Sequence, residues 1–428
     1  MTEANSKDKE SFPLLTVAAA EGPTGPRRRR KSSLLGSGVH LGDTRAPALA
    51  SSRMAMDASS PTEKRSKKRR ARSALYKMRN AILKHTYLLP ALMLATFGLL
   101  YAVNPSPSNP VYHFIFLSYP QKPLLDDQPM QYGKGPWDFA FVTFYTVVLS
   151  FTREFIMQEI LRPMARWFGL SKGKQARFME QVYTAIYFAC LGPFGLYVMS
   201  KTPVWYYNTT GMYENFPHRT HEAIVKFYYL FQAAYWAQQA IVLVLGLEKP
   251  RKDFKELIAH HIVSLLLIGL SYRFHFTYIG LAVYTTHDIS DFFLATSKTL
   301  NYLDSPIVGP YFFVFMMVWI YCRHYINLQI IWSLFTEFRT VGPFELDWET
   351  EQYKCLLSQM ITTALLSSLQ ALNLFWLFHI VRIAYRFIRY SSADDDRSDN
   401  EEDESDDSNV SSEKKEPSVD IKVTDEKN

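Results

Sequence analysis

The sequence is poor in cysteine. Its 428 residues include only Cys190, Cys322 and Cys355, each in or beside an apolar segment. An odd number at this spacing suits neither a disulfide framework nor a zinc ribbon, so we expect small core residues. An apolar run at the start is also lacking, which argues against a cleaved signal peptide. The first apolar segment, beyond residue 80, is therefore expected to act as its own insertion signal.

Charge is scarce in the middle of the chain and gathers at the two ends. The first stretch is basic, with RRRRK at 27–31 and KRSKKRRAR at 64–72, and the last stretch, from residue 391, is acidic. Both ends have too few apolar residues to offset the entropy lost on ordering, so we expect them to be disordered. The second basic run resembles a nuclear-localisation patch, but its place before an apolar segment favours a topology signal or a contact with anionic lipid. We expect no nucleic-acid partner.

Long apolar segments fill the region between these ends. A membrane-spanning helix needs about 20 mostly apolar residues, and about eight segments satisfy this requirement. They lie near 84–103, 137–157, 179–200, 223–247, 257–273, 276–299, 307–336 and 355–383. The sequence thus predicts an all-α polytopic membrane protein. Its expected divisions are a basic N-terminus (1–80), a helix pair with a lumenal loop (81–174), a region of about six spans (175–390) and an acidic tail (391–428).

The loops carry an orientation signal, since cytosolic loops are rich in Lys and Arg. Loops 158–178 and 248–256 are basic, and the second contains Lys249, Arg251, Lys252 and Lys255. The opposite loops have fewer positive charges, and one holds the N-glycosylation pattern NTT at Asn208, which functions only in the lumen. Both termini are therefore predicted to be cytosolic.

Two consecutive apolar segments contain ionisable residues. The first, LIAHHIVSLLLIGLSYRF at 257–274, holds His260 and His261, and the second, beginning YTTHDISD at 284, holds His287, Asp288 and Asp291. Such residues face the interior of a bundle or a water-filled cavity because lipid excludes them. A purely structural role in holding helices together is the alternative. Five ionisable residues on two neighbouring segments favour a functional site.

A short link near 273–275 predicts that the two segments form an antiparallel hairpin. Counting residues from the turn places His260 at the depth of Asp291 and His261 at that of Asp288, an arrangement in which a carboxylate orients an imidazole. The histidines are too few for a di-iron centre, although a single metal remains an alternative. Acyl transfer by an imidazole nucleophile or base requires no metal. A proton-coupled transporter is a further alternative, without an internal repeat to support it.

The run HHIVSLLLIGLSYRFHFTYIGLAVYTTHDISDFFLATSKTLNY, residues 260–302, resembles the signature of ceramide synthases, the longevity-assurance branch of the TLC-domain membrane proteins. The lack of a homeobox-like insert makes the chain similar to the fungal type. The resemblance implies a helical bundle around a central cavity in the endoplasmic-reticulum membrane. It also implies an enzyme that joins fatty acyl-CoA to the amine of a sphingoid base, giving dihydroceramide or phytoceramide, with no cofactor besides this substrate. A non-enzymatic TLC-domain protein of lipid sensing or trafficking is the alternative.

The resemblance also implies roles for individual residues. His260 and His261 correspond to the essential histidines, with His260 as the acyl-accepting nucleophile, and Asp288 and Asp291 to the essential acids. Direct attack by the amine, with histidine as general base only, stays open. The supporting residues of the site are predicted to be His287 and Tyr284.

Four further sets of expectations concern the periphery and the partners. Lys249, Arg251, Lys252 and Lys255 could pair with CoA phosphates, although topology alone explains them equally well. The aromatic run at 311–321 is a candidate wall for the acyl tunnel. Acidic residues follow three tail serines, a pattern for acidophilic kinases, and an unregulated solubilising tail is the alternative; the serines are Ser391, Ser392 and Ser398. The fungal-type resemblance implies a small single-span regulatory subunit, and a homodimer or a heterodimer with a paralogue is also expected.

Overall fold

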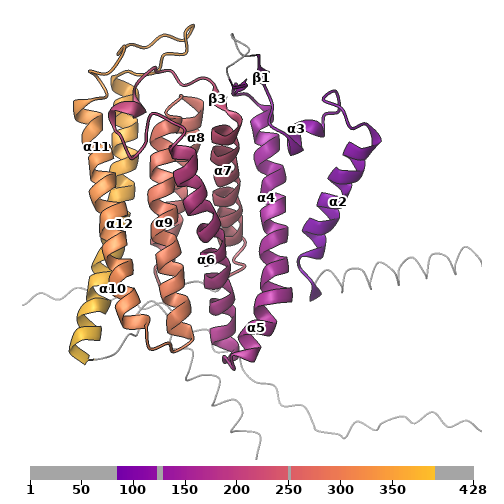
Figure 1. The fold of residues 1–428 in the computed structure, drawn as a ribbon, viewed down its shortest axis with the longest axis vertical. Helices are drawn as coiled ribbons and strands as arrows, with labels where there is room; N and C mark the ends of the chain where they lie inside the picture. The colour runs from indigo at the N-terminus through magenta and orange to yellow at the C-terminus, as the bar shows by residue number, and fades with distance from the viewer. Residues whose placement is uncertain (1–83, 123–128, 249–251, 391–428) are drawn as a thin grey trace, which may run out of the picture. The chain divides into compact units, whose positions relative to one another are not determined.

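The described part of the chain is almost entirely helical. A computed structural model describes residues 84–122, 129–248 and 252–390, all within the unit Arg65–Asn428. The predicted disordered ends, 1–80 and 391–428, lie outside the described residues. Figure 1 shows the long helices running alongside one another.

Each of the eight predicted apolar segments falls on a helix. In chain order the helices are α2 (Leu88–Val103), α3 (Tyr112–Ile115), α4 (Trp137–Phe155), the π-helical segment η1 (Ile156–Leu161), α5 (Arg162–Trp167), α6 (Lys172–Met199), the 3-10 turn η2 (Thr210–Met212), α7 (Ala223–Val244), α8 (Phe254–Arg273), α9 (Thr277–Tyr302), α10 (Val308–Trp319), the π-helical segment η3 (Ile320–Ile326), α11 (Asn327–Thr336) and α12 (Leu356–Tyr390). The all-α membrane architecture is confirmed.

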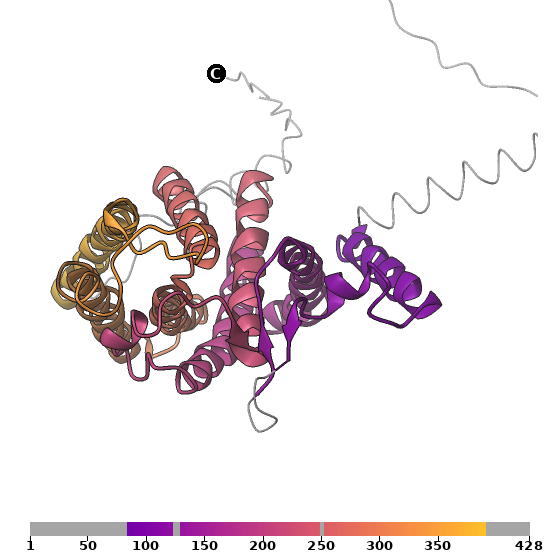
Figure 2. The same ribbon diagram turned by 90° about the horizontal axis from the view of Figure 1, so that it is seen from above.

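The count of eight spans is not confirmed. Within the described ranges, four helical stretches are long and apolar enough to cross a membrane: Trp137–Trp167, Lys172–Met199, Phe254–Arg273 and Leu356–Arg389. Helix α2 is shorter, with 16 residues. Helices α7 and α9 carry buried polar side chains such as Lys226 and Asp288, which lower their hydropathy. Figure 2 shows α2 at the margin beside α4, and none of its residues is buried.

Three short strands join the N-terminal helices to α7. Strands β1 (Pro120–Gln121), β2 (Gln131–Tyr132) and β3 (His221–Glu222) form an antiparallel sheet in the order β1-β2-β3. Beneath it the buried Lys226 Nζ lies 2.7 Å from Asp138 Oδ1. The same ammonium donates to the carbonyls of Ser118 at 2.9 Å and Gly133 at 2.6 Å. A buried charge pair with its remaining protons satisfied is the arrangement that tolerates burial, and it ties α4 to α7.

The close packing of α6, α7 and α9 depends on a glycine. A Cβ atom at Gly195 would lie 2.8 Å from Thr285 Cγ2 and still closer to Tyr228 Oη. Tyr228 is fully buried in the largest core cluster, and Thr285 is fully buried beside it. Real Cβ atoms do not approach other atoms this closely, so a larger residue must displace Tyr228 or Thr285.

We expect Gly195→Ala to lower the melting temperature in detergent, because overpacking a dense core costs about 1–3 kcal/mol. Gly269→Ala on α8 is the matched control. Nothing lies within 4 Å of its added methyl group, and alanine favours a helix, so its melting temperature should be equal or higher. Equal melting temperatures for both variants and the wild type would contradict this view of the core.

The turn between α8 and α9 spans residues 274–276, one residue later than the predicted link at 273–275, and carries a polar cluster. Lys134 Nζ lies 3.2 Å from His275 Nδ1 and donates to Thr277 Oγ1 at 2.7 Å. His218 Nδ1 lies 3.2 Å from the His275 carbonyl.

The pKa values of this cluster are lowered. Burial lowers the pKa of His218 to about 4. Burial together with Lys134 lowers the pKa of His275 to about 3, although Glu351 lies 3.4 Å away. Burial likewise lowers the pKa of Lys134 to about 7.

These shifts predict that acid destabilises the protein. Below about pH 6.5 the unfolded chain protonates His218 and His275 while the native protein does not, so native stability is lost as the pH falls. Each histidine contributes a slope of about 1.4 kcal/mol per pH unit until its native pKa is reached. The melting temperature should fall between pH 7 and pH 5, and His275→Asn should reduce that fall. An unchanged pH profile in this variant would contradict the assignment.

Candidate active site

The five predicted ionisable residues lie on α8 and α9. The short turn makes these helices consecutive and antiparallel, which confirms the predicted hairpin. His260, His287 and Asp288 are buried, and His261 and Asp291 are half-buried. The residues thus face protein rather than lipid, as their cost in hydrocarbon requires.

Two tryptophans that the sequence reasoning missed enclose the first imidazole. The ring of His260 lies 5.5 Å from that of Trp236 on α7 and 5.3 Å from that of Trp376 on α12, both in edge-to-face geometry. His261 is 5.7 Å from His260, and its Nδ1 lies 2.9 Å from the Leu257 carbonyl. Donation from Nδ1–H to this carbonyl leaves Nε2 of His261 as the nitrogen with a lone pair.

Helix α7 holds the first carboxylate. Tyr228 Oη donates to Asp288 Oδ2 at 2.8 Å, and Gln232 Nε2 donates to the same oxygen. Gln232 is oriented in turn because its Oε1 accepts a hydrogen bond of 3.1 Å from Tyr187. Asp288 is fully buried. The predicted pairing of Asp288 with His261 is therefore wrong: the hydrogen bonds of the described residues join this carboxylate to α7 instead.

An arginine holds the second carboxylate. Arg323 Nη2 donates to Asp291 Oδ1 at 2.5 Å, its Nε donates to Ser290 Oγ at 2.6 Å and its Nη1 to Asn373 Oδ1 at 3.2 Å. The guanidinium also lies 4.2 Å from the centre of the Trp319 ring. Within the described ranges this carboxylate makes no hydrogen bond to His260, so the predicted pairing of Asp291 with His260 is wrong.

The correction has a physical cause. Depth along a hairpin can be counted from its turn, but the direction in which a side chain points depends on the neighbouring helices. Arg323 lies in the π-helical segment η3, whose wider turn changes the direction of side chains between α10 and α11. A guanidinium satisfies a buried carboxylate better than a neutral imidazole because the bond is charge-assisted.

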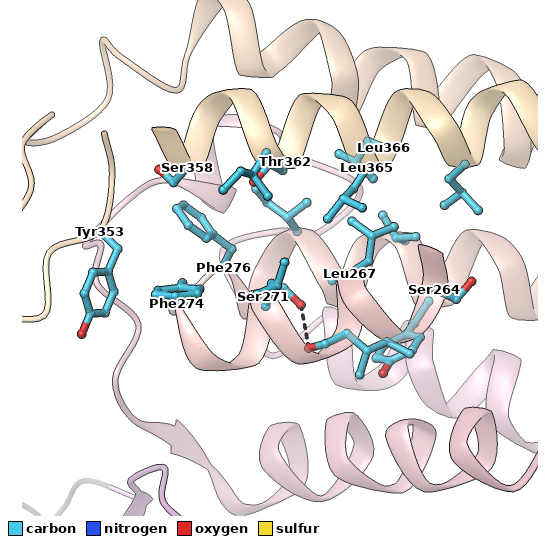
Figure 3. Close-up of a pocket in the computed structure, with 18 of the residues that line it drawn as sticks. Ser264, Leu267, Ser271, Phe274, Phe276, Tyr353, Ser358, Thr362, Leu365 and Leu366 are labelled. Carbon is cyan, nitrogen blue, oxygen red and sulfur yellow. Dashed lines mark hydrogen bonds between the residues drawn. The ribbon is translucent and has the colours of Figure 1, made fainter. Parts of the chain in front are cut away.

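An apolar cavity of about 190 Å³ lies between α8, α9 and α12. Figure 3 shows side chains of these helices around it, with Ser271 hydrogen-bonded to Tyr229 Oη. It extends from Leu346 and Tyr353, which precede α12, to Trp236 and His287 in the bundle interior. The predicted aromatic wall at 311–321 does not line it. Two residues of that run, Phe315 and Trp319, pack against Trp376 and Ile380 instead.

The two predicted supporting residues line the cavity at its inner end. His287 Nδ1 lies 2.8 Å from the Val283 carbonyl, to which it donates. His287 Nε2 and Tyr284 Oη are buried and have no hydrogen-bond partner among the described residues. Both residues line the cavity, so these unpartnered groups are candidates to bind the polar group of a substrate.

Only some of the residues predicted at the periphery of the site lie in the described part of the chain. Lys249 and Arg251 lie outside the described residues, as do Ser391, Ser392 and Ser398. Lys252 and Lys255 are exposed at the start of α8, before His260. Asn208 is exposed, and its Nδ2 donates to the Pro203 carbonyl at 3.2 Å. Across 84–122, 129–248 and 252–390, no group of three His, Cys, Asp or Glu residues is placed to hold a metal ion.

Comparison with known proteins identifies the fold and its relatives. Residues 177–382 match the family model of the TLC domain. A sphingosine N-acyltransferase-like protein of Gibberella moniliformis is 54% identical over 341 residues, which cover 78% of this chain and 88% of that protein. A sphingosine N-acyltransferase of Schizosaccharomyces pombe is 48% identical over 79% of this chain and 88% of that protein.

A third relative extends the match toward the ends. A ceramide synthase of Saccharomyces cerevisiae is 43% identical over 388 residues, which cover 87% of this chain and 92% of that protein. The match includes the helices that carry the buried histidines and carboxylates as well as the N-terminal helices. The chain therefore belongs to the sphingosine N-acyltransferase, or ceramide synthase, family of TLC-domain membrane proteins.

Proposed function

We propose that this protein transfers the acyl group of a fatty acyl-CoA to the amine of a sphingoid base, forming a ceramide and free CoA. The observation that carries the proposal is the position of His260. Its ring packs against Trp236, which lines the inner end of the apolar cavity, and Ser264 one turn along α8 lines the same cavity. An acyl chain can occupy this space while its thioester lies beside the imidazoles.

The reaction proceeds in two transfers. A ring nitrogen of His260 attacks the thioester carbonyl carbon, the C–S bond breaks, and the CoA thiolate leaves as an acyl-imidazole forms. The amine of the base then attacks the same carbon, and the C–N bond to His260 breaks. Nε2 of His261 takes the proton that the amine loses, because its Nδ1 proton is held by the Leu257 carbonyl. Direct attack by the amine on the thioester is the alternative mechanism and uses the same residues.

The two carboxylates have positioning roles in this mechanism. Asp288 links the α9 side of the site to Tyr228 and Gln232, and Asp291 links it to Arg323. Their bonds fix α9 against α7 and η3, so that His287 and Tyr284 are held at the cavity. Neither carboxylate needs to change its protonation state in either transfer.

The remaining proposals concern the surroundings of the enzyme. We propose that Lys252 and Lys255, which are exposed at the start of α8, bind the phosphates of a cytosolic CoA together with Lys249 and Arg251 of the same sequence segment. We propose a location in the endoplasmic-reticulum membrane, and the positive loops support an orientation with both termini in the cytosol and Asn208 glycosylated in the lumen. We also propose phosphorylation of Ser391, Ser392 and Ser398, no cofactor, a single-span regulatory subunit, and dimerisation with a second copy or a paralogue.

His260→Ala should lower kcat by at least about 100-fold, the usual contribution of a nucleophile or general base. The assay uses purified protein, acyl-CoA and sphinganine, and ceramide is measured by mass spectrometry. His113→Ala is the control, since His113 lies on α3, where its Nδ1 is bonded to Ser118. Intact-mass measurement with acyl-CoA alone should show one added acyl group in the wild type and none in His260→Ala. Equal ceramide formation by all three proteins would contradict the proposed site.

Breaking the Asp291–Arg323 pair tests the positioning role. Arg323→Gln leaves a buried carboxylate unpaired, which costs about 3–5 kcal/mol, so both the melting temperature and kcat should fall. Asp291→Asn combined with Arg323→Gln removes both charges and should recover much of the melting temperature. If the double variant recovers stability but not kcat, the charged pair matters for the reaction itself. A double variant as unstable as Arg323→Gln would contradict the pairing.

A further inference from the structure

Trp236 has an unusual position among the aromatic residues of the bundle. It lies on α7, its side chain is only 8% exposed, and its ring centre is 5.5 Å from that of His260 and 6.0 Å from that of His261. The same residue lines the inner end of the apolar cavity. Its indole Nε1 is buried and has no hydrogen-bond partner in the part of the chain that the structure describes.

A buried indole N–H that has no protein acceptor beside a cavity indicates that a ligand supplies the acceptor. The indole N–H can only donate, buried tryptophans usually find an acceptor for it, and a buried donor without one costs about 1–3 kcal/mol. Trp376 shows the contrast. Its ring lies 5.3 Å from that of His260, but its Nε1 donates to Asp253 Oδ2 at 3.1 Å. Of the two indoles on His260, the one that lines the cavity is the one whose donor is left without a protein acceptor.

We propose that Trp236 Nε1–H is the donor that stabilises the oxyanion formed on the acyl carbonyl. The inference rests on the acyl transfer proposed above. The nucleophile forms a bond to the carbonyl carbon, and the π electron pair of C=O moves to oxygen, where the indole N–H donates to it. The pair then returns to re-form C=O as the C–S bond breaks and CoA leaves as a thiolate.

This role holds for either mechanism of transfer. An oxyanion forms whether the attacking atom is a nitrogen of His260 or the amine of the base, and it forms again when the acyl-imidazole is consumed. A donor fixed in a site from which water is excluded stabilises such charge without reorganisation. Trp236 is fixed in this sense, because it packs against Tyr235, His260 and His261.

Two other groups at the cavity also lack a hydrogen-bond partner, but they are less suited to stabilising the oxyanion. Tyr284 Oη and His287 Nε2 also have no partner among the described residues. Neither ring is among those that contact His260, whereas Trp236 contacts both members of the histidine pair. The carbonyl that His260 attacks lies within reach of the indole that touches His260.

The test removes the N–H with the least change in shape. Replacing Trp236 by β-(3-benzothienyl)alanine exchanges the N–H for sulfur in a ring of nearly the same size, and Trp236→Phe removes it by ordinary mutagenesis. Both should lower kcat by about 100-fold or more, the usual effect of losing one oxyanion donor. The KM for acyl-CoA should change by less than about threefold, because the bond strengthens only in the transition state.

Trp376→Phe is the matched control, since it changes the other indole on His260. It should lower kcat by less than about tenfold, while its melting temperature reports the loss of the bond to Asp253. Full kcat in the benzothienylalanine protein, or equal losses in the Trp236 and Trp376 variants, would overturn the proposal and leave Trp236 a packing residue. A wild type that forms no ceramide in this assay would remove the acyl-transfer function itself, so the two failures are distinguishable.

Discussion

The requirement that buried charges be paired determines which helices of this protein meet. Asp288 and Asp291 lie inside a bundle from which lipid excludes unpaired charge. Oδ2 of Asp288 accepts from two donors of α7, and Asp291 accepts from a guanidinium of η3. Helix α9 is thereby fixed on two sides, and Arg323 continues the network to Asn373 on α12. The bonds of these two carboxylates and of Arg323 thus join α7, α9 and α12, three helices that contribute to the lining of the cavity.

The same constraint attaches the N-terminal helices to the TLC domain. Helix α4 lies before residue 177, where the family match begins. At one end Asp138 forms a buried pair with Lys226 of α7, and at the other Arg153 lies 2.5 Å from Glu248, shortly before the start of α8. Tyr272 of α8 also donates to Asp138 Oδ2 at 2.8 Å, so a helix outside the matched domain takes part in positioning the helix that carries the paired histidines.

Much of this arrangement could be predicted from the sequence, because its causes are local. The helices, the α8–α9 turn and the inward direction of His260 and Asp288 follow from apolar length and the cost of burying charge in lipid. The partners of the carboxylates could not be predicted, since they depend on the rotation of other helices. Arg323 did leave a signal: a cation inside the predicted span 307–336. Trp236 left none, because aromatic residues are frequent throughout these helices.

The distribution of polar atoms along the cavity gives it a direction. Ser271 and Ser358 line the part nearer the α8–α9 turn, and both have protein partners, Tyr229 Oη and the Cys355 carbonyl. At the inner end, Trp236 Nε1 and His287 Nε2 have none among the described residues. A substrate with one polar reactive group on a long hydrocarbon chain can supply partners to these two groups when its polar group lies at the inner end. For the acyl transfer proposed above, this distribution favours a thioester at the inner end, beside the Trp236 ring that packs against His260, and alignment of this kind is itself a large part of the catalysis of acyl transfer.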